Sequence, residues 1–153
     1  MRTRMKSLIV AGAVSALTML GGVSQAHAIS DGDVTTCSHY DETLCLFYNS
    51  NLAGAHVGIY GLVNNYDVDV PDCQSEGCPT YEYLTSGSGE LQNVKNNSAS
   101  VYNENSSSVY QVFYNSNEAG SSDLWDPEGY GTFYGNLVNT YNENASQDCQ
   151  CSA

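Results

Sequence analysis

The sequence has 153 residues, enough for one domain with a buried core and too few for two ordinary domains. Only 14% of the residues are charged, against about 25% in an average protein, and 17 acidic residues oppose 4 basic ones for a net charge of −13. This shortage of Lys and Arg argues against nucleic acid and anionic membranes as partners. The 12 tyrosines and the apolar fraction of 41% argue against disorder.

The N-terminus has the pattern of a secretory signal peptide. Three bases precede an apolar stretch at residues 8–23, and an Ala-x-Ala cleavage site follows at residues 26–28. Two polar residues and two glycines interrupt the apolar stretch, which disfavours the alternative, a membrane anchor. We therefore expect a signal peptide over residues 1–28 and a secreted, extracellular protein. The three bases are Arg2, Arg4 and Lys6.

Removal of this signal leaves a single domain over residues 29–153. All 17 acids lie in it and Lys95 is its one base, so its net charge is −16. The three methionines, Met1, Met5 and Met19, leave with the signal. The expected mature protein therefore offers a trypsin-like protease one basic cleavage site and has no oxidisable methionine.

Six cysteines follow the signal peptide. An even number in a short exported chain indicates three disulfides, although six cysteines allow 15 connectivities. Nearness in sequence favours pairing each cysteine with its neighbour, but the last pair would close a very small ring. Zinc is the alternative, and the tandem Cys-x2-4-Cys spacing of structural zinc sites is absent. The favoured pairs are Cys37–Cys45, Cys73–Cys78 and Cys149–Cys151.

An internal repeat dominates the rest of the chain. Leu44–Gly54 (LCLFYNSNLAG) and Tyr110–Gly120 (YQVFYNSNEAG) match at seven of eleven positions, with an offset of 66 residues. A second echo pairs Ser100–Asn105 (SVYNEN) with Thr140–Asn144 (TYNEN). Each unit therefore is expected to begin with an aromatic segment and a turn and to end near Tyr-Asn-Glu-Asn.

The local signals in both units predict β-structure. Residues 44–48 and 110–114 are rich in aromatic and aliphatic side chains, and Asn-Ser-Asn and Ala-Gly supply turn residues after them. Residues 55–60 alternate like a strand with one buried face, and no helical period occurs outside the signal. Two such units predict an all-β sandwich of paired Greek keys. Further strands are expected around Val101, Val109, Val112 and Leu137.

The first unit carries additional sequence. Residues 64–89 form an acidic, turn-rich insertion that contains Cys73 and Cys78. Long loops in compact domains are usually functional or disordered, and the cysteine pair indicates that this one is tied down. We expect the first key over about residues 44–105 and the second over about 110–145, followed by a cysteine-containing tail at 146–153.

Two sets of residues resemble known families. Phe47-x6-Gly54, repeated as Phe113-x6-Gly120, resembles the aromatic-x6-Gly signature of βγ-crystallin Greek keys. The run from Cys37 through Cys45-Leu-Phe-Tyr-Asn to Gly54 resembles the start of secreted bacterial peptidase inhibitors of the metalloproteinase-inhibitor type, which have a βγ-crystallin-like domain. Asn96–Asn103 resembles a further segment of that family, so the resemblance spans about residues 37–145.

This resemblance implies a peptidase inhibitor that presents a disulfide-closed loop to the cleft of a secreted peptidase. The reactive bond would be Cys73–Gln74, and its carbonyl would approach the metal of a zinc peptidase. Closure by a disulfide reduces the entropy lost on docking and keeps the new ends together after cleavage. The alternative is a disulfide that only pins a surface loop. The protease-contact loop is Cys73, Gln74, Ser75, Glu76, Gly77 and Cys78.

Calcium is a second property that the resemblance implies. The calcium motif of βγ-crystallin keys, (Asn/Asp)-(Asn/Asp)-x-x-(Ser/Thr)-Ser, aligns with residues 95–100 and gives Asn96, Asn97 and Ser100 as weak candidate ligands. Lys95 and Ala99 stand at ligand-type positions, and an ammonium group opposes a cation. The alternative function is therefore a non-inhibitory extracellular binding or calcium-binding module, and no other cofactor is expected.

Nothing in the sequence points to catalysis. His39 and His56 are the only histidines after the signal, and the common zinc-peptidase, nucleophile-elbow and phosphate-loop motifs are absent. We therefore predict a protein that is not an enzyme. The single tryptophan, Trp125, lies in an acidic segment and is expected to be a core aromatic of the second key rather than a contact residue.

Overall fold

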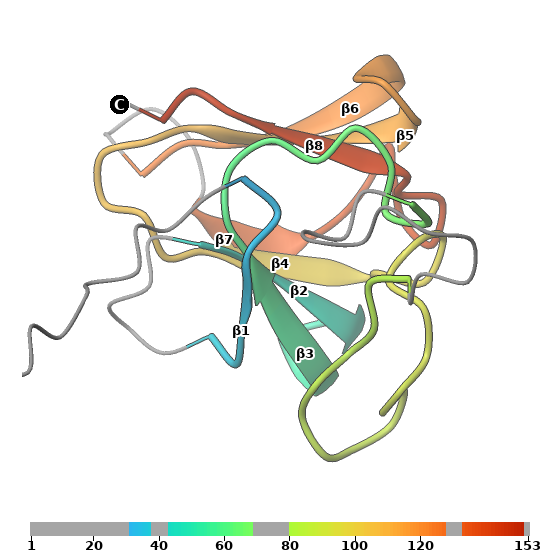
Figure 1. Cartoon of the computed structure of the whole chain (residues 1–153). Helices are drawn as coiled ribbons and strands as arrows, with labels where there is room; N and C mark the ends of the chain where they lie inside the picture. Colours follow the sequence, from blue (N-terminus) through green and yellow to red (C-terminus); the bar gives the residue numbers. More distant parts are fainter. Residues whose placement is uncertain (1–30, 38–42, 69–79, 128–132, 152–153) are drawn as a thin grey trace, which may run out of the picture.

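A computed structural model describes residues 31–37, 43–68, 80–127 and 133–151. These residues form antiparallel strands in two sheets that face one another (Figure 1), and the described ranges contain no helix. The expected signal peptide and the loop from Cys73 to Cys78 lie outside them. The strands are β1 (Val34–Thr35), β2 (Leu44–Asn49), β3 (Ala53–Ile59), β4 (Ser100–Asn103), β5 (Tyr110–Asn115), β6 (Ala119–Trp125), β7 (Tyr134–Asn136) and β8 (Ser146–Cys149).

The two units exchange strands between the sheets. The first sheet has the order β1-β3-β2-β4-β7, so β7 of the second unit completes the sheet of the first. In return, Val63 of the first unit pairs with Gln147 in β8, at the edge of the second sheet, whose order is β6-β5-β8. This reciprocal pairing confirms the predicted all-β sandwich of two Greek keys.

The strands that the repeat predicts for the two hairpins agree with the observed strands. The segments predicted at residues 44–48, 55–60 and 110–114 correspond to β2, β3 and β5. Val101 and Val112 also lie in strands, whereas Val109 and Leu137 lie one residue outside β5 and β7. The tail expected after residue 145 contains β8, which pairs with β5 along four residues.

The second echo in the sequence was aligned wrongly. Ser100 pairs with Phe47, and Ser146 pairs with Phe113, so the structural equivalent of Ser100 is Ser146, at an offset of 46. The exchanged segments are equivalent at Val63, which pairs with Gln147, and Gly135, which pairs with Val101, so their offset is 72. The offset therefore falls from 72 to 46 between these segments and the serines, and the difference of 26 residues is the insertion in the first key. The true repeat is Asn-x-x-Ala-Ser, which the shared Tyr-Asn-Glu-Asn letters obscured.

A serine in each key fastens the hairpin turn. The Ser100 hydroxyl donates to the Asn49 carbonyl at 2.6 Å and accepts from the Leu52 amide at 2.9 Å. In the second key Ser146 donates to the Asn115 carbonyl at 2.8 Å. The turn needs left-handed backbone, with φ +58° at Leu52. This folded hairpin explains the aromatic-x6-Gly spacing, since a Cβ on Gly54 would meet the Asn49 side chain at 2.8 Å.

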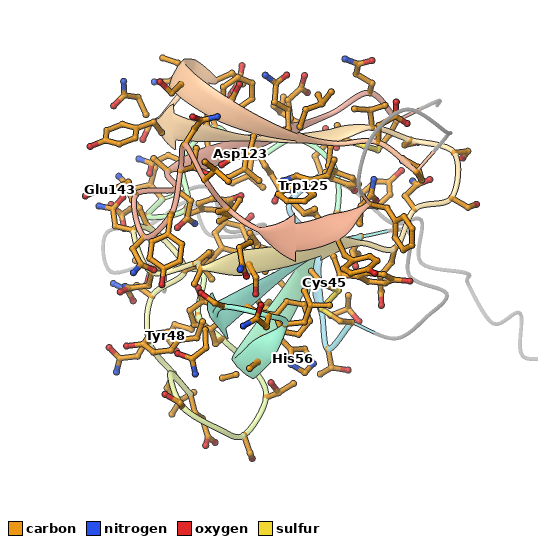
Figure 2. The ribbon with its side chains drawn as sticks, turned by 180° about the vertical axis from the view of Figure 1, so that it is seen from behind. Cys45, Tyr48, His56, Asp123, Trp125 and Glu143 are labelled. Atoms are coloured by element: carbon orange, nitrogen blue, oxygen red, sulfur yellow. A yellow bond between two sulfur atoms is a disulfide. The ribbon has the colours of Figure 1, made fainter. Side chains whose placement is uncertain are left out.

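Tyrosines supply much of the core between the sheets. Aliphatic side chains of β2, β3 and β5 meet Trp125, which is only 5% exposed and lies between the sheets (Figure 2), as expected for a core aromatic. The Tyr66 hydroxyl donates to the buried Gln147 side chain at 2.9 Å, which in turn donates to the Gly61 carbonyl at 2.8 Å. The core therefore combines apolar packing with buried hydrogen bonds, and the Trp125 Nε1 is a buried donor without a partner among the described residues. The buried tyrosines are Tyr66, Tyr81, Tyr83 and Tyr110.

The end of the insertion covers the edge of β3. The Ala55 amide donates to the Ser88 carbonyl at 2.9 Å, and the Leu84 amide donates to the His56 carbonyl at 3.1 Å. Gly89 then packs directly on the Tyr48 ring. This segment therefore protects an edge strand that would otherwise be open to pairing with another chain.

Alkaline pH is expected to unfold the domain through its buried tyrosines. Burial raises the pKa of Tyr66 well above its ordinary value, and it raises the pKa of Tyr83 although the Ser98 hydrogen bond acts to lower it. Above the ordinary tyrosine pKa of about 10, the unfolded chain binds fewer protons than the folded one, so stability is full below that pH and falls above it by up to about 1.4 kcal/mol per pH unit per tyrosine. Phenolate absorbance and near-UV circular dichroism should change together in a pH titration. Ionisation of all tyrosines without loss of structure would contradict this expectation.

Replacement of Gly89 by alanine should destabilise the insertion. A Cβ at this position would lie 2.1 Å from the Tyr48 ring, and the φ of +91° strains any side chain. We expect Gly89→Ala to lower the free energy of unfolding by about 2 kcal/mol or more in urea denaturation. Ser88→Ala is the matched control, since its side chain is exposed, and should change stability by less than about 0.5 kcal/mol. Equal effects of the two variants would show that Gly89 has no special role.

Candidate functional site

The candidate site is the base from which the chain leaves the sandwich after Asp67 and to which it returns at Thr80. The predicted protease-contact residues, Cys73 to Cys78, lie between these points and outside the described residues. The Tyr81 amide donates to the Tyr66 carbonyl at 3.1 Å, and the two rings pack edge to face with centroids 6.0 Å apart. Two buried tyrosines therefore join the two legs of the segment at its base.

Each leg of this base is attached to the rest of the domain. The Tyr66 amide donates to the Ala145 carbonyl of the second key at 3.0 Å. The Tyr81 hydroxyl donates to the Gly32 carbonyl at 3.1 Å, and the Val94 amide donates to the Tyr81 carbonyl at 2.8 Å. The base is thus held by both keys and by the segment preceding β1.

The returning leg continues as a short hairpin. The Tyr83 amide donates to the Gln92 carbonyl at 3.1 Å, and the Leu91 amide donates to the Tyr83 carbonyl at 3.1 Å. The buried Tyr83 hydroxyl lies 2.8 Å from the Ser98 hydroxyl. These bonds connect the hairpin to the turn at residues 93–97, where the calcium candidates lie.

The calcium candidates have structural bonds in this domain. The Ser100 hydroxyl is bonded to the hairpin turn as described above. The Asn97 amide group donates to the Asn93 carbonyl at 3.0 Å and to the Lys95 carbonyl at 3.2 Å, while Asn96 is exposed with a φ of +60°. Within the described ranges, no group of three or more His, Cys, Asp or Glu residues could hold a metal ion. Calcium binding at Asn96, Asn97 and Ser100 stays a prediction.

A buried asparagine of the second key holds this turn. The Asn144 side chain donates to the Val94 carbonyl at 3.0 Å and accepts from the Ser98 amide at 2.9 Å. The backbone repeats the contact in both directions, from the Asn96 amide to the Asn144 carbonyl and from the Asn142 amide to the Ser98 carbonyl. Asn144 was not predicted as a site residue, because the shared Tyr-Asn-Glu-Asn letters hid the correct alignment. Matching Asn96-x-x-Ala-Ser to Asn142-x-x-Ala-Ser places Asn144 opposite Ser98 in the equivalent turn.

Two of the predicted disulfides lie in the described part of the chain. Cys37 is bonded to Cys45, which fastens the segment after β1 to β2. Cys149 and Cys151 are bonded to each other. The pair Cys73–Cys78 lies outside the described residues and stays a prediction.

Two titratable residues outside this base, His56 and Asp123, have structural partners. His56 packs on Phe47 with ring centroids 4.9 Å apart, and its Nδ1 lies 3.1 Å from the Thr85 hydroxyl. The Asp123 carboxylate accepts hydrogen bonds from the backbone amides of residues 138–140 and from the Thr140 hydroxyl at 2.8 Å. Figure 2 places His56 and Asp123 in different parts of the domain. The other histidine after the expected signal peptide, His39, lies outside the described residues.

An exposed aromatic cluster was not anticipated from the sequence. Tyr102 of β4 lies 5.8 Å from Phe133 and 6.3 Å from Tyr134 of β7, measured between ring centroids. Phe133 and Tyr134 are 40% and 48% exposed. These rings come together only because β7 crosses to the sheet of the first key.

No helix in the described part of the chain is long and apolar enough to cross a membrane.

Comparison with solved structures shows a distant likeness. No family model and no curated protein matches the chain. The chain is similar to a solved structure described as "Evolution of the eye lens beta-gamma-crystallin domain fold", with 8% identity, a TM-score of 0.46, and coverage of 73% of this chain and 88% of the other. The strand pairings described above define the architecture of the sandwich by themselves.

Replacement of Asn144 should weaken the whole junction below the site. Asn144→Ala removes two buried hydrogen bonds and leaves the Ser98 amide without its acceptor, while the Val94 carbonyl keeps only the longer bonds from the Asn97 amide at 3.2 Å and the Ser98 hydroxyl at 3.4 Å. We expect the free energy of unfolding to fall by about 2–4 kcal/mol in urea denaturation. The neighbouring exposed residue provides the control, since Glu143→Gln should change it by less than about 0.5 kcal/mol. A loss below about 1 kcal/mol for Asn144→Ala would show that the junction is not a stabilising centre.

Proposed function

We propose that this protein is a secreted peptidase inhibitor, directed at metalloproteinases, that presents the Cys73–Cys78 loop to the protease cleft. The observation that supports the proposal is the base at Tyr66 and Tyr81. Both legs of the segment that contains Cys73 and Cys78 start from buried, hydrogen-bonded residues. A binding segment that starts and ends at fixed points loses less conformational entropy on docking than one on free legs.

The same base suits the chemistry of a slowly cleaved inhibitor. If a zinc peptidase cut the Cys73–Gln74 bond, the Cys73–Cys78 bridge and the joined legs would hold the two new ends near one another. Proximity of this kind favours rejoining of the bond over release of the fragments. The inhibitor would then stay bound to the peptidase while the Cys73–Gln74 bond is slowly cut and rejoined.

The remainder of the chain suits a protease-rich environment. After the expected signal peptide, Lys95 is the only Lys or Arg, and its side chain is 21% exposed and paired with Asp67. A trypsin-like enzyme therefore finds one basic residue, in a partly protected place. Durability of this kind is needed by an inhibitor that works among active peptidases.

A panel of secreted metallo-, serine and cysteine peptidases tests this proposal. The intact mature protein should inhibit at least one zinc peptidase at stoichiometric concentration. The Cys73→Ser/Cys78→Ser variant should inhibit it about tenfold more weakly, because the opened loop must be ordered on binding. The matched control, Cys37→Ser/Cys45→Ser, removes the disulfide between β2 and the segment after β1 and should retain the inhibition constant while it is folded.

Failure of the intact protein to inhibit any peptidase of the panel would overturn the proposed function. The alternative, a non-inhibitory extracellular binding or calcium-binding module, would then remain. Its candidate surface is the aromatic cluster of Tyr102 in β4, Tyr134 in β7 and Phe133, which directly precedes β7.

A further inference from the structure

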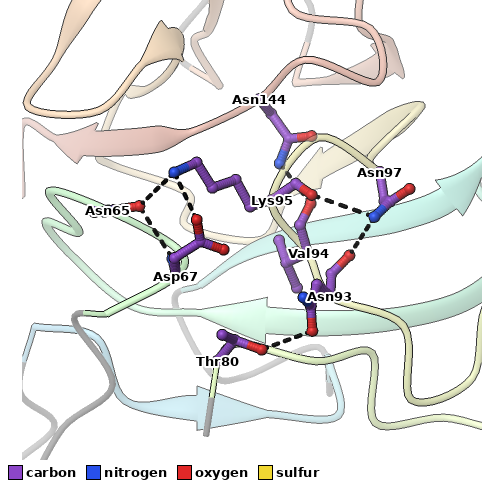
Figure 3. Close-up of polar contacts among 8 residues, drawn as sticks. All are labelled: Asn65, Asp67, Thr80, Asn93, Val94, Lys95, Asn97 and Asn144. Atoms are coloured by element: carbon purple, nitrogen blue, oxygen red, sulfur yellow. Dashed lines mark hydrogen bonds and ion pairs between the residues drawn. The ribbon is translucent and has the colours of Figure 1, made fainter. Parts of the chain in front are cut away.

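The turn at residues 93–97 contacts both legs of the candidate site (Figure 3). On the outgoing leg, the Lys95 ammonium donates to the Asp67 carboxylate at 2.7 Å and to the Asn65 side-chain carbonyl at 3.0 Å. On the returning leg, the Thr80 hydroxyl donates to the Asn93 side-chain carbonyl at 2.6 Å. We call these five residues, Asn65, Asp67, Thr80, Asn93 and Lys95, the bracket.

The outgoing leg is closed on itself at the bracket. The Asn65 side-chain oxygen accepts both from the Lys95 ammonium and, at 3.1 Å, from the Asp67 amide. The ammonium therefore lies between two oxygen atoms that the same short turn provides. Tyr66 lies between Asn65 and Asp67 in the chain and is buried and hydrogen-bonded to the second key. Its burial determines which face of the outgoing leg is turned toward Lys95.

The turn that carries the bracket is itself held from behind. The Asn97 side chain donates to the carbonyls of Asn93 and Lys95, and the Asn144 side chain donates to the Val94 carbonyl. The bracket therefore connects both legs of the segment, which is inserted in the first key, to the second key.

We propose that the bracket consists of positioning residues that hold the two legs in the arrangement in which the Cys73–Cys78 loop binds a peptidase and resists cleavage. This inference rests on the proposed function and extends it to residues that do not touch the peptidase. Loss of the bracket frees the outgoing leg to pivot at Tyr66, so the locally open form becomes more populated. Cleavage in residues 69–79 then accelerates and the affinity for the peptidase falls.

The ion pair gives the bracket a measurable signature. Lys95 and Asp67 are 21% and 40% exposed, so their attraction is modest and is screened by salt. Lys95→Met and Asp67→Ala break the same pair with opposite changes in net charge. We expect each to accelerate cleavage by a non-specific protease, and to raise the inhibition constant, by about threefold to fivefold at low salt. In the double variant, the cleavage rate and the inhibition constant should be close to those of the single variants, because all three lack the same ion pair.

The experiment measures two quantities on the folded mature protein. Mass spectrometry gives the rate of cleavage within residues 69–79, and titration against the peptidase found in the panel gives the inhibition constant. Lys95→Arg should retain wild-type values, and the effects of the two single variants should shrink in about 1 M salt. Glu143→Gln, an exposed charge change outside the bracket, is the control and should change neither quantity.

The outcomes separate this inference from the proposed function. Unchanged cleavage in both single variants, additive effects in the double variant, or an unchanged inhibition constant with faster cleavage would each overturn the positioning role. Faster cleavage in the variants of a protein that inhibits no peptidase would overturn both the proposed function and the affinity role of the bracket. Faster cleavage together with weaker inhibition, rescued by Lys95→Arg, supports both.

Discussion

Neither Greek key of this domain can complete its own sheet, because the third strand of each key pairs with the other key. β7 pairs with β4, and Val63 pairs with Gln147 in β8. A hairpin alone would leave open edges and half of its apolar face in water. The exchange removes both problems at once, so the two keys form one cooperative unit rather than two small domains.

The consequences of this exchange extend to the candidate site. Because the keys are intertwined, the turn that precedes β4 lies against its counterpart before β8, and Asn144 bonds with Val94 and Ser98 across the junction. The insertion of the first key leaves and returns beside this junction. A long segment is thereby attached to a part of the domain that hydrogen bonds from both keys hold in place, which suits the presentation of a binding loop.

The tyrosine-rich core is the second condition for this arrangement. Tyr66 and Tyr81 provide large apolar rings for a core that contains few leucines, and their hydroxyl groups reach polar partners in β8 and in the segment before β1. An aliphatic side chain could fill the same space but could not bond to Gln147 or to the Gly32 carbonyl. The same residues therefore close the core and fix the legs of the insertion. Lys95 adds the outermost contact, with its ammonium between the oxygen atoms of Asn65 and Asp67, so the residue that disfavours the calcium motif has a structural role of its own.

The sequence by itself determined the β class, the two hairpins and the insertion, and it favoured the Cys37–Cys45 pairing, because these depend on residues close together in the chain. The repeat at an offset of 66 required similar hairpins, and Gly54 and Gly120 marked their turns. Only the tertiary structure decided the register of the later strands, which moved the equivalent of Ser100 to Ser146 and turned an expected tail into β8. It also decided which side chains surround the insertion, since Lys95 contacts the outgoing leg, Asn93 contacts the returning leg, and Asn144 of the second key holds the turn that carries both. The physical reason is that a repeated motif specifies a local shape, whereas the exchange of strands between the two copies depends on how the complete sandwich buries its faces.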